Sequence, residues 1–240
     1  VTFGWRAAFV ALGLFSSMVF AASVMHLPET NQHKNTRATE LGGMLANYRL
    51  VLGSRIFWSN ALPGAFSYGI IFSFISGSSF VFINVLGVPT ANFGYCFALG
   101  VSGYMTGTLI CRRLLKSISP AQALRMGTAC SMGAGLFFLA ATLIGLSHWS
   151  MMVVAMFVAM VAHGINFPVT QSGAIAPFPA QAGTAAGLMG ALFMLFAFII
   201  GSVVGATHNG TLYPLALIVC LLGTLNFFSA RAITLKAAVA

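Results

Sequence analysis

Long apolar runs, separated by short polar or Gly- and Pro-containing breaks, dominate the 240-residue sequence. An α-helix needs about twenty apolar residues to cross the roughly 30 Å hydrocarbon core of a bilayer, because it rises about 1.5 Å per residue. Seven runs come close to that length: Ala7–Val24, Ile56–Phe80, Phe93–Cys111, Leu124–Leu146, Trp149–Thr170, Thr184–Ala206 and Leu212–Ser229. The pattern predicts an all-α polytopic membrane protein with about seven transmembrane helices.

The longest polar break separates the first predicted span from the other six. Residues 28–55 contain both acidic residues of the chain, Glu29 and Glu40, together with several basic ones. We expect an extramembrane linker here, with a short interfacial helix at Leu41–Leu52. Six-helix units joined by a longer cytoplasmic loop are common in secondary transporters. The expected organisation is a span at 1–27 that belongs to another bundle, a cytoplasmic linker at 28–55, a six-helix bundle at 56–229 and a cytoplasmic tail at 230–240.

Composition supports a membrane protein and argues against nucleic-acid binding. Hydrophobic residues make up 59% of the chain and charged residues 5%, whereas a soluble domain carries about 25% charged residues. The formal charge is +9, but the basic residues are scattered between spans rather than gathered on one soluble face. The four cysteines lack metal-site or disulfide spacing and are interpreted as small hydrophobes. The sequence predicts no metal, no cofactor and no nucleic-acid partner.

The basic residues predict the orientation of the chain, since Lys and Arg near span ends stay in the cytoplasm. With residues 28–55 inside, ten of the eleven basic residues lie inside and Arg6 lies outside. We therefore expect a bacterial inner-membrane protein with a periplasmic amino end and a cytoplasmic carboxyl end. Arg112, Arg113 and Lys116 are expected to determine topology and to meet anionic lipid headgroups. A seven-helix receptor is an alternative, but the long first linker and the absence of a late-span Lys for a retinal Schiff base argue against it.

Polar residues on the fifth predicted span are the strongest candidates for a site. His163 is the one ionisable residue that the pattern places deep in a span, and Asn166 and Thr170 follow it at i+3 and i+7. This spacing puts all three side chains on one helix face. Such a face avoids lipid, because lipid leaves its hydrogen bonds unmade. It either lines a cavity for substrate or protons, with His163 as the proton-coupling candidate, or fixes helix packing through hydrogen bonds.

The second and third predicted spans carry weaker candidates for the same cavity. Ser67 and Tyr68 lie near Pro63, which can bend the helix, and Phe74 could stack against an aromatic substrate. Ser102 continues a polar line on the third span. The residues expected to line a substrate cavity are Ser67, Tyr68, Phe74, Ser102, His163, Asn166 and Thr170. Packing is the alternative role for each.

Glycines mark expected helix contacts, because small side chains let membrane helices approach closely. Gly103 and Gly107 form a small-xxx-small pair on the third span. The sixth span has a longer set of glycines, which we interpret as another packing surface: Gly183, Gly187, Gly190, Gly201 and Gly205.

Five short motifs follow one another along the chain. They are Gly4-Trp5-Arg6, Leu27-Pro28-Glu29-Thr30, FSFISGSSFV at 72–81, NFGYCFAL at 92–99, and Phe178-Pro179 followed by AGTAA at 182–186. With these motifs, essentially the whole chain resembles the carboxyl-terminal portion, spans 6 to 12, of the bicyclomycin and chloramphenicol resistance (Bcr/CflA) branch of the major facilitator superfamily.

The resemblance implies export of small drugs or metabolites in exchange for protons, by alternating access between two six-helix bundles. It also implies that Arg112, Arg113 and Lys116 could close a cytoplasmic gate. The family's first five spans, with the acidic residue usually linked to proton coupling, have no counterpart here. The sequence starts at Val1 as if interrupted, so we expect a truncated portion of a twelve-span transporter.

The implied partners are a small amphipathic molecule, protons, membrane lipids and the missing amino-terminal half. Two other functions stay open: a non-transporting remnant or accessory membrane subunit, and a major-facilitator importer of sugars or purines. The chain carries no Gly-rich phosphate loop, HExxH sequence or paired carboxylates, so the sequence predicts a transporter rather than an enzyme.

Overall fold

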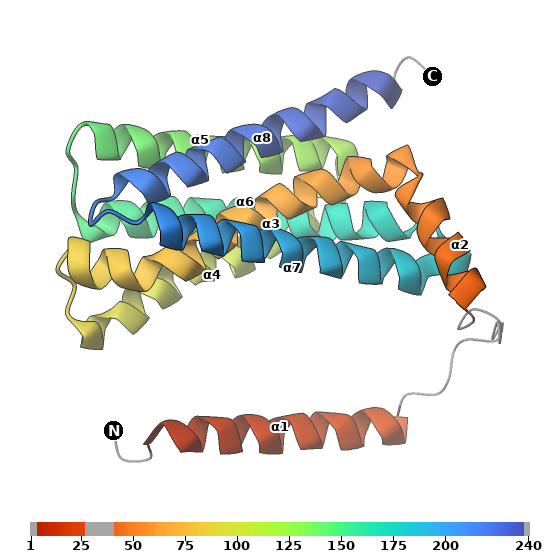
Figure 1. Cartoon of the computed structure of the whole chain (residues 1–240), viewed down its shortest axis with the longest axis horizontal. Coiled ribbons are helices and arrows are strands. Elements are labelled where there is room, and N and C mark those ends of the chain that lie inside the picture. The colour runs from red at the N-terminus through yellow and green to blue at the C-terminus, as the bar shows by residue number, and fades with distance from the viewer. Residues whose placement is uncertain (1–3, 27–40, 238–240) are drawn as a thin grey trace. The chain divides into compact units, whose positions relative to one another are not determined.

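The computed structural model describes residues 4–26 and 41–237, and all the regular elements within these ranges are helices (Figure 1). Their bounds are α1 Gly4–His26, α2 Leu41–Leu52, α3 Arg55–Phe80, α4 Thr90–Leu114, α5 Pro120–Leu143, α6 Trp149–Ile175, α7 Ala182–Thr207 and α8 Tyr213–Ala237, with a π-helical turn at Val81–Val85 and a 3-10 turn at Pro179–Gln181. Seven helices are long and apolar enough to span a membrane: α1 and α3 to α8. The prediction of a seven-span, all-α membrane protein is confirmed.

The chain divides into two compact units, Val1–Met44 and Leu45–Ala240. In the first unit, α1 is a single helix whose large apolar side chains are exposed from Phe9 to Met25. The predicted short helix at Leu41–Leu52 is present as α2. The rest of the expected linker, including Glu29 and Glu40, lies outside the described residues.

A local capping group explains why α5 begins earlier than hydropathy alone predicts. At the start of α5, the Gln122 backbone N–H donates to Ser119 Oγ at 3.3 Å, and the Ser119 backbone N–H donates to Gln122 Oε1 at 3.0 Å. This reciprocal pair is a capping box, and Pro120 occupies the first helical position, where its missing N–H costs nothing. At the other end of the chain, α8 continues to Ala237 through part of the expected tail.

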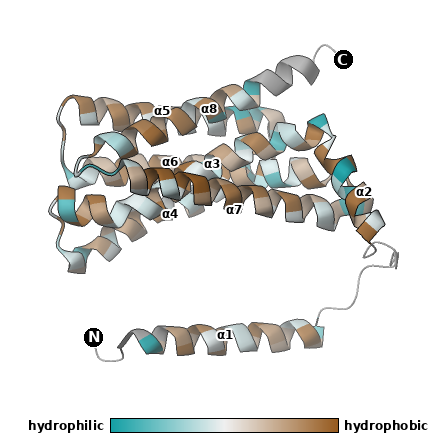
Figure 2. Ribbon diagram, in the orientation of Figure 1, coloured by the Kyte–Doolittle hydropathy of each residue, from teal (hydrophilic) through white to brown (hydrophobic). Residues whose placement is uncertain are grey.

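The second unit is a bundle of six long helices that run alternately in opposite directions (Figure 1). α6 packs against α3, α4 and α5, α8 packs against α3 and α5, and α7 packs mainly against α3. Figure 2 shows apolar residues along the length of the helices, most densely on α7, where Met194, Leu195 and Phe198 are exposed. Exposed apolar surface of this extent suits contact with lipid or with other membrane helices.

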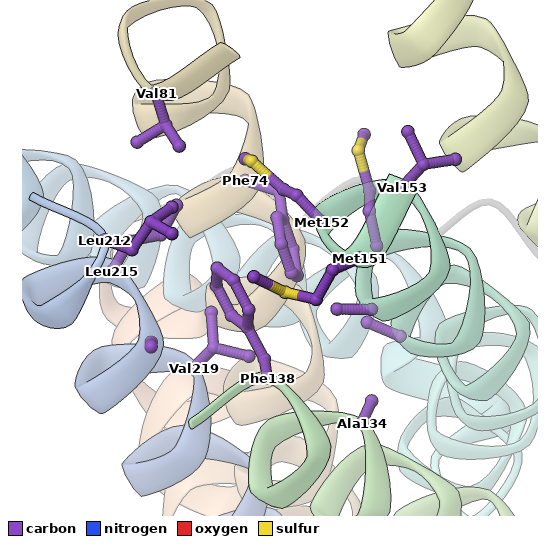
Figure 3. Packing of buried hydrophobic residues seen from close by; sticks show 14 of the residues in the cluster. Phe74, Val81, Ala134, Phe138, Met151, Met152, Val153, Leu212, Leu215 and Val219 are labelled. Atoms are coloured by element: carbon purple, nitrogen blue, oxygen red, sulfur yellow. The ribbon is translucent and has the colours of Figure 1, made fainter. Parts of the chain in front are cut away.

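One end of the bundle has a closely packed apolar core (Figure 3). The Phe74 and Phe138 rings stack with centroids 5.8 Å apart, and Met151, Met152 and Val219 surround them. Phe74 is fully buried. The structure therefore places this expected cavity residue inside the apolar core, and any contact with substrate there stays a prediction.

Glycines bring α4 and α6 into backbone contact. A Cβ atom added to Gly103 would collide with the Phe157 carbonyl oxygen, and one added to Gly107 would collide with the Val161 carbonyl oxygen. The reciprocal position, Gly164 on α6, lies against the Tyr104 carbonyl oxygen, which a Cβ would approach to 2.5 Å. The predicted contact surface around Gly103 and Gly107 is confirmed, and it holds α6 in the register that forms the site below.

Candidate functional site

His163 occupies the middle of α6 and bonds to α3. Its Nδ1 atom lies 3.0 Å from Ser67 Oγ, and both residues are buried. The two residues are 96 positions apart in the chain, so the contact depends entirely on how α3 packs on α6. The imidazole and the hydroxyl therefore satisfy each other's hydrogen-bonding needs in the interior of the bundle.

Asn166 extends this contact to two further helices. Its side-chain Nδ2 donates to Ser67 Oγ at 3.4 Å and to Ser131 Oγ on α5 at 3.2 Å. Asn226 on α8 donates to the same Ser131 oxygen at 3.2 Å. Asn166 and Asn226 are fully buried. The result is a polar network across α3, α5, α6 and α8, and interhelix hydrogen bonds of this kind typically contribute about 0.6 kcal/mol each in a membrane protein.

Three aromatic rings also lie close to His163. The rings of Phe167, Tyr104 and Tyr68 have centroids 5.3, 5.7 and 6.2 Å from the imidazole. Tyr68 in turn stacks on Phe193 of α7 at 5.3 Å. The imidazole therefore contacts both a polar network and an aromatic wall that is built from α3, α4, α6 and α7.

An open cavity of about 530 Å³ adjoins this wall. Tyr104 and Phe167 line the cavity and also flank His163, and Gln171 lies one helical turn beyond Phe167. The Gln171 Oε1 atom is buried and has no hydrogen-bond partner among the described residues. The lining combines two aromatic rings with the polar side chains of Gln171 and Ser172, which suits a small molecule that has both an apolar face and a hydrogen-bonding group.

The expected site residues divide into three groups. Ser67, His163 and Asn166 meet directly, and Tyr68 contacts the imidazole. Thr170 is buried one turn away and donates its hydroxyl hydrogen to backbone oxygens of α6, including that of Asn166 at 2.8 Å. Ser102 lies apart on the exposed side of α4, where its hydroxyl bonds to the Leu99 carbonyl oxygen.

Sequence reasoning missed five residues of this region: Tyr104, Ser131, Phe167, Gln171 and Asn226. Phe167 and Gln171 follow His163 at i+4 and i+8, so the same helix-face spacing could have identified them. Asn226 is an amide inside a predicted span, which by itself signals an interior contact. Nothing in the sequence singles out Ser131, because hydroxyls in membrane helices commonly bond to their own backbone.

The basic residues gather at one end of the bundle. Arg112 and Arg113 end α4, Lys116 follows in the turn to α5, and all three side chains are exposed. Every other Lys or Arg whose side chain is described between 45 and 231 lies within about two turns of that end: Arg49, Arg55, Arg125 and Arg231. The opposite end, with the α3–α4, α5–α6 and α7–α8 connections, has no Lys or Arg in the described part of the chain.

Comparison with known proteins places the chain in a transporter family. Residues 1–202 match the Major Facilitator Superfamily. A bicyclomycin resistance protein homolog of Haemophilus influenzae is 28% identical over 218 residues, which cover 89% of this chain and 53% of that protein. An uncharacterized MFS-type transporter of Bacillus subtilis, YdgK, is 25% identical, with 93% of this chain and 56% of that protein covered.

An uncharacterized transporter of Rickettsia felis is 26% identical over 89% of this chain and 55% of its own length. The chain therefore spans about half the length of the curated relatives that it matches. The first of these relatives agrees with the resemblance to bicyclomycin resistance proteins, and all are named as resistance proteins or transporters rather than enzymes. With its seven apolar helices and the match over residues 1–202, the chain belongs to the Major Facilitator Superfamily of membrane transporters.

Proposed function

We propose that the chain is the carboxyl-terminal portion of a secondary transporter that exports small amphipathic molecules in exchange for protons. The observation that carries this proposal is a buried histidine, bonded into a four-helix polar network, beside an open aromatic cavity. Buried ionisable groups in membrane proteins are commonly parts of ion or substrate pathways, because their burial in lipid-facing bundles is costly. Here His163 carries the proton, and the cavity next to Tyr104 and Phe167 takes the transported molecule.

The cavity chemistry suits a molecule with an apolar or aromatic face and at least one hydrogen-bonding group. Tyr104 and Phe167 offer faces for stacking, and Gln171 and Ser172 add polar side chains to the lining. The sequence has no Asp or Glu after position 40, so this bundle attracts no cation by direct charge pairing. Bicyclomycin is the first compound to test, since a relative is named for resistance to it.

Accumulation of labelled bicyclomycin in energised bacterial cells tests this proposal. The chain alone and the chain joined to the amino-terminal half of the Haemophilus influenzae relative are compared with empty vector. We expect lower accumulation with the joined protein, and loss of that difference when a protonophore collapses the proton gradient. If the chain alone lowers accumulation, the chain is complete for transport. If neither protein lowers accumulation, the proposal that bicyclomycin is a substrate is wrong. If the lower accumulation persists in the presence of the protonophore, proton exchange is contradicted.

We also propose that the protein lies in the bacterial inner membrane with the basic end of the bundle in the cytoplasm, because basic flanks are retained there. Ser117 and Ser147 are exposed serines at opposite ends of α5, so Ser117→Cys and Ser147→Cys are a matched pair. In a background without the four native cysteines, a membrane-impermeant thiol reagent on intact spheroplasts is expected to label Ser147→Cys alone. Labelling of Ser117→Cys without permeabilisation would reverse the orientation.

A further inference from the structure

The bonding pattern around Asn166 extends to the position of the proton on His163. We infer that Ser131 and Asn226 are positioning residues: through Asn166 and Ser67, they keep the neutral imidazole protonated on Nε2 and leave Nδ1 as the basic nitrogen. The inference rests on the proposed function, in which His163 carries the proton. It assigns a role to two residues, on α5 and α8, that make no contact with the imidazole themselves.

The first step is the hydroxyl of Ser131, which has one hydrogen to donate and two lone pairs to accept with. The hydrogen goes to the Gly127 carbonyl oxygen at 3.2 Å. Asn166 and Asn226 both approach the same oxygen at 3.2 Å. Since its hydrogen is already used, Ser131 can only accept from them, so both amides must present their NH2 groups to it. This orientation leaves Asn166 Oδ1 and Asn226 Oδ1 buried with no hydrogen-bond partner among the described residues.

The second step transfers this orientation to Ser67. The second N–H of the Asn166 amide points to Ser67 Oγ at 3.4 Å, so Ser67 also accepts from Asn166. The hydroxyl hydrogen of Ser67 is then free to donate to His163 Nδ1, 3.0 Å away. If Nδ1 carried the hydrogen instead, Ser67 Oγ would accept from both Asn166 and His163. The Ser67 hydroxyl hydrogen would then have lost the imidazole as its acceptor. The neutral imidazole therefore carries its proton on Nε2.

An incoming proton must then bind Nδ1, the nitrogen that faces Ser67. Once Nδ1 carries a hydrogen, Ser67 Oγ accepts from it, and the Ser67 hydroxyl needs a new acceptor. Asn166 Oδ1 can become that acceptor if the amide rotates by half a turn, which withdraws an N–H from Ser131. A buried acceptor without a hydrogen-bond donor is costly. In this reversal of the Asn166 amide, its Oδ1 atom gains a donor, the Ser67 hydroxyl. Protonation of His163 on α6 is thereby communicated to α5 and α8.

The other titratable groups near His163 come from two helices. Tyr68 on α3 and Tyr104 on α4 flank its ring. Cys111 on α4 lies against the Ile165 carbonyl oxygen, with its sulfur 3.7 Å away. On α5 and α7, the described side chains that complete the surroundings are Ser131, through Asn166, and Phe193, through Tyr68. The sequence has no Asp or Glu after Glu40, so residues 41–237 contribute no carboxylate side chain to the surroundings of His163.

Nitrogen NMR of the whole chain in lipid nanodiscs, labelled with 15N-histidine, tests the inference. The 15N shifts distinguish the Nε2–H form, the Nδ1–H form and the imidazolium, and His163→Gln identifies the His163 signals among the five histidines. At pH above the titration of His163, we expect the Nε2–H form to exceed the Nδ1–H form by about tenfold or more, which corresponds to one well-made buried hydrogen bond. Ser131→Ala should reduce that ratio about tenfold, and Asn226→Leu should reduce it less.

Ser73→Ala is the matched control, because Ser73 is also a buried serine whose hydroxyl bonds to the carbonyl oxygen four residues earlier, that of Gly69. Its described hydrogen bond goes to Gly69 and not to any residue of the network, so the tautomer ratio should not change. A dominant Nδ1–H form in the unaltered chain overturns the inference even if a variant fails to fold. So does an unchanged ratio in a folded Ser131→Ala protein.

The NMR measurement needs no substrate and no gradient, so it is independent of transport. If export does not depend on His163 while the tautomer ratio responds as expected, the proposed proton exchange fails and the positioning role of Ser131 and Asn226 stands. If export depends on His163 and the ratio ignores Ser131, the positioning role fails alone.

Discussion

Gly107→Ala is expected to destabilise the bundle by about 3 kcal/mol, although alanine is the better helix former by about 1 kcal/mol. The added methyl group would collide with the Val161 carbonyl oxygen of α6, and the Val161 Cα atom would lie 2.9 Å from it. Backbone cannot turn aside as a side chain can, so α4 must move away from α6. The loss of folded protein on heating, measured by detergent size-exclusion chromatography, reports the change.

Gly94→Ala is the control on the same helix. Nothing lies within 4 Å of a Cβ added at Gly94, so this change should gain roughly the helix propensity of alanine, up to about 1 kcal/mol. The two substitutions are chemically identical and are expected to act with opposite signs. Equal melting temperatures for both variants would show that α4 does not meet α6 through Gly107.

His163→Gln is expected to lower proton-driven export by about tenfold or more, the usual size of a coupling between two ligands. Glutamine can still hydrogen-bond to Ser67, but it cannot take up a proton. The remaining transport should therefore lose its dependence on the pH gradient, while the amount of folded protein in the membrane stays close to normal. Export is measured in proteoliposomes or cells at imposed pH gradients, with the joined protein if the chain alone is inactive.

His208→Gln serves as the control for this experiment. His208 is exposed just after α7, where its ring contacts Phe80 and lies outside the polar network. The same chemical change there should leave export and its pH dependence intact. Export by His163→Gln that still follows the pH gradient as before would exclude His163 as the proton carrier.

Helix positions could be predicted because each depends on a local property. The length of an apolar run decides whether a helix can cross a bilayer, whatever its neighbours are. All seven spans followed from this property, and the short helix expected at Leu41–Leu52 is also present. The errors lie at the ends, as in α5, where the Ser119 capping box starts the helix at Pro120 rather than at Leu124.

The candidate site could be predicted only in part. The i, i+3 spacing of His163 and Asn166 placed both on one face of α6, and the polar character of that face indicated that it avoids lipid. The same reasoning could not show that Asn166 reaches Ser131 or that Asn226 joins it from α8. It also could not separate Ser67, which meets His163, from Phe74, which is in the apolar core.

The glycines show most directly what the sequence alone leaves undecided. Gly103 and Gly107 on α4 touch the backbone of α6, as expected. On α7, a Cβ added to Gly201 would approach Phe72 to 2.9 Å, but nothing described lies within 4 Å of one added to Gly183, Gly187, Gly190 or Gly205. Within the described bundle, Gly201 alone of this set makes a close helix contact, and a packing role for the other four glycines stays a prediction. Identical small-residue spacing produced both outcomes.

The sequence by itself determined the membrane class, the number and approximate limits of the spans, and the helix face that carries His163. These follow from hydrogen bonds within each helix and from the transfer of apolar side chains into lipid, which depend on one segment at a time. Only the tertiary structure decided which polar groups meet and which glycines touch another helix. In lipid, apolar faces are nearly equivalent, so the choice between them depends on shape and on a few interhelix hydrogen bonds that involve residues far apart in the chain.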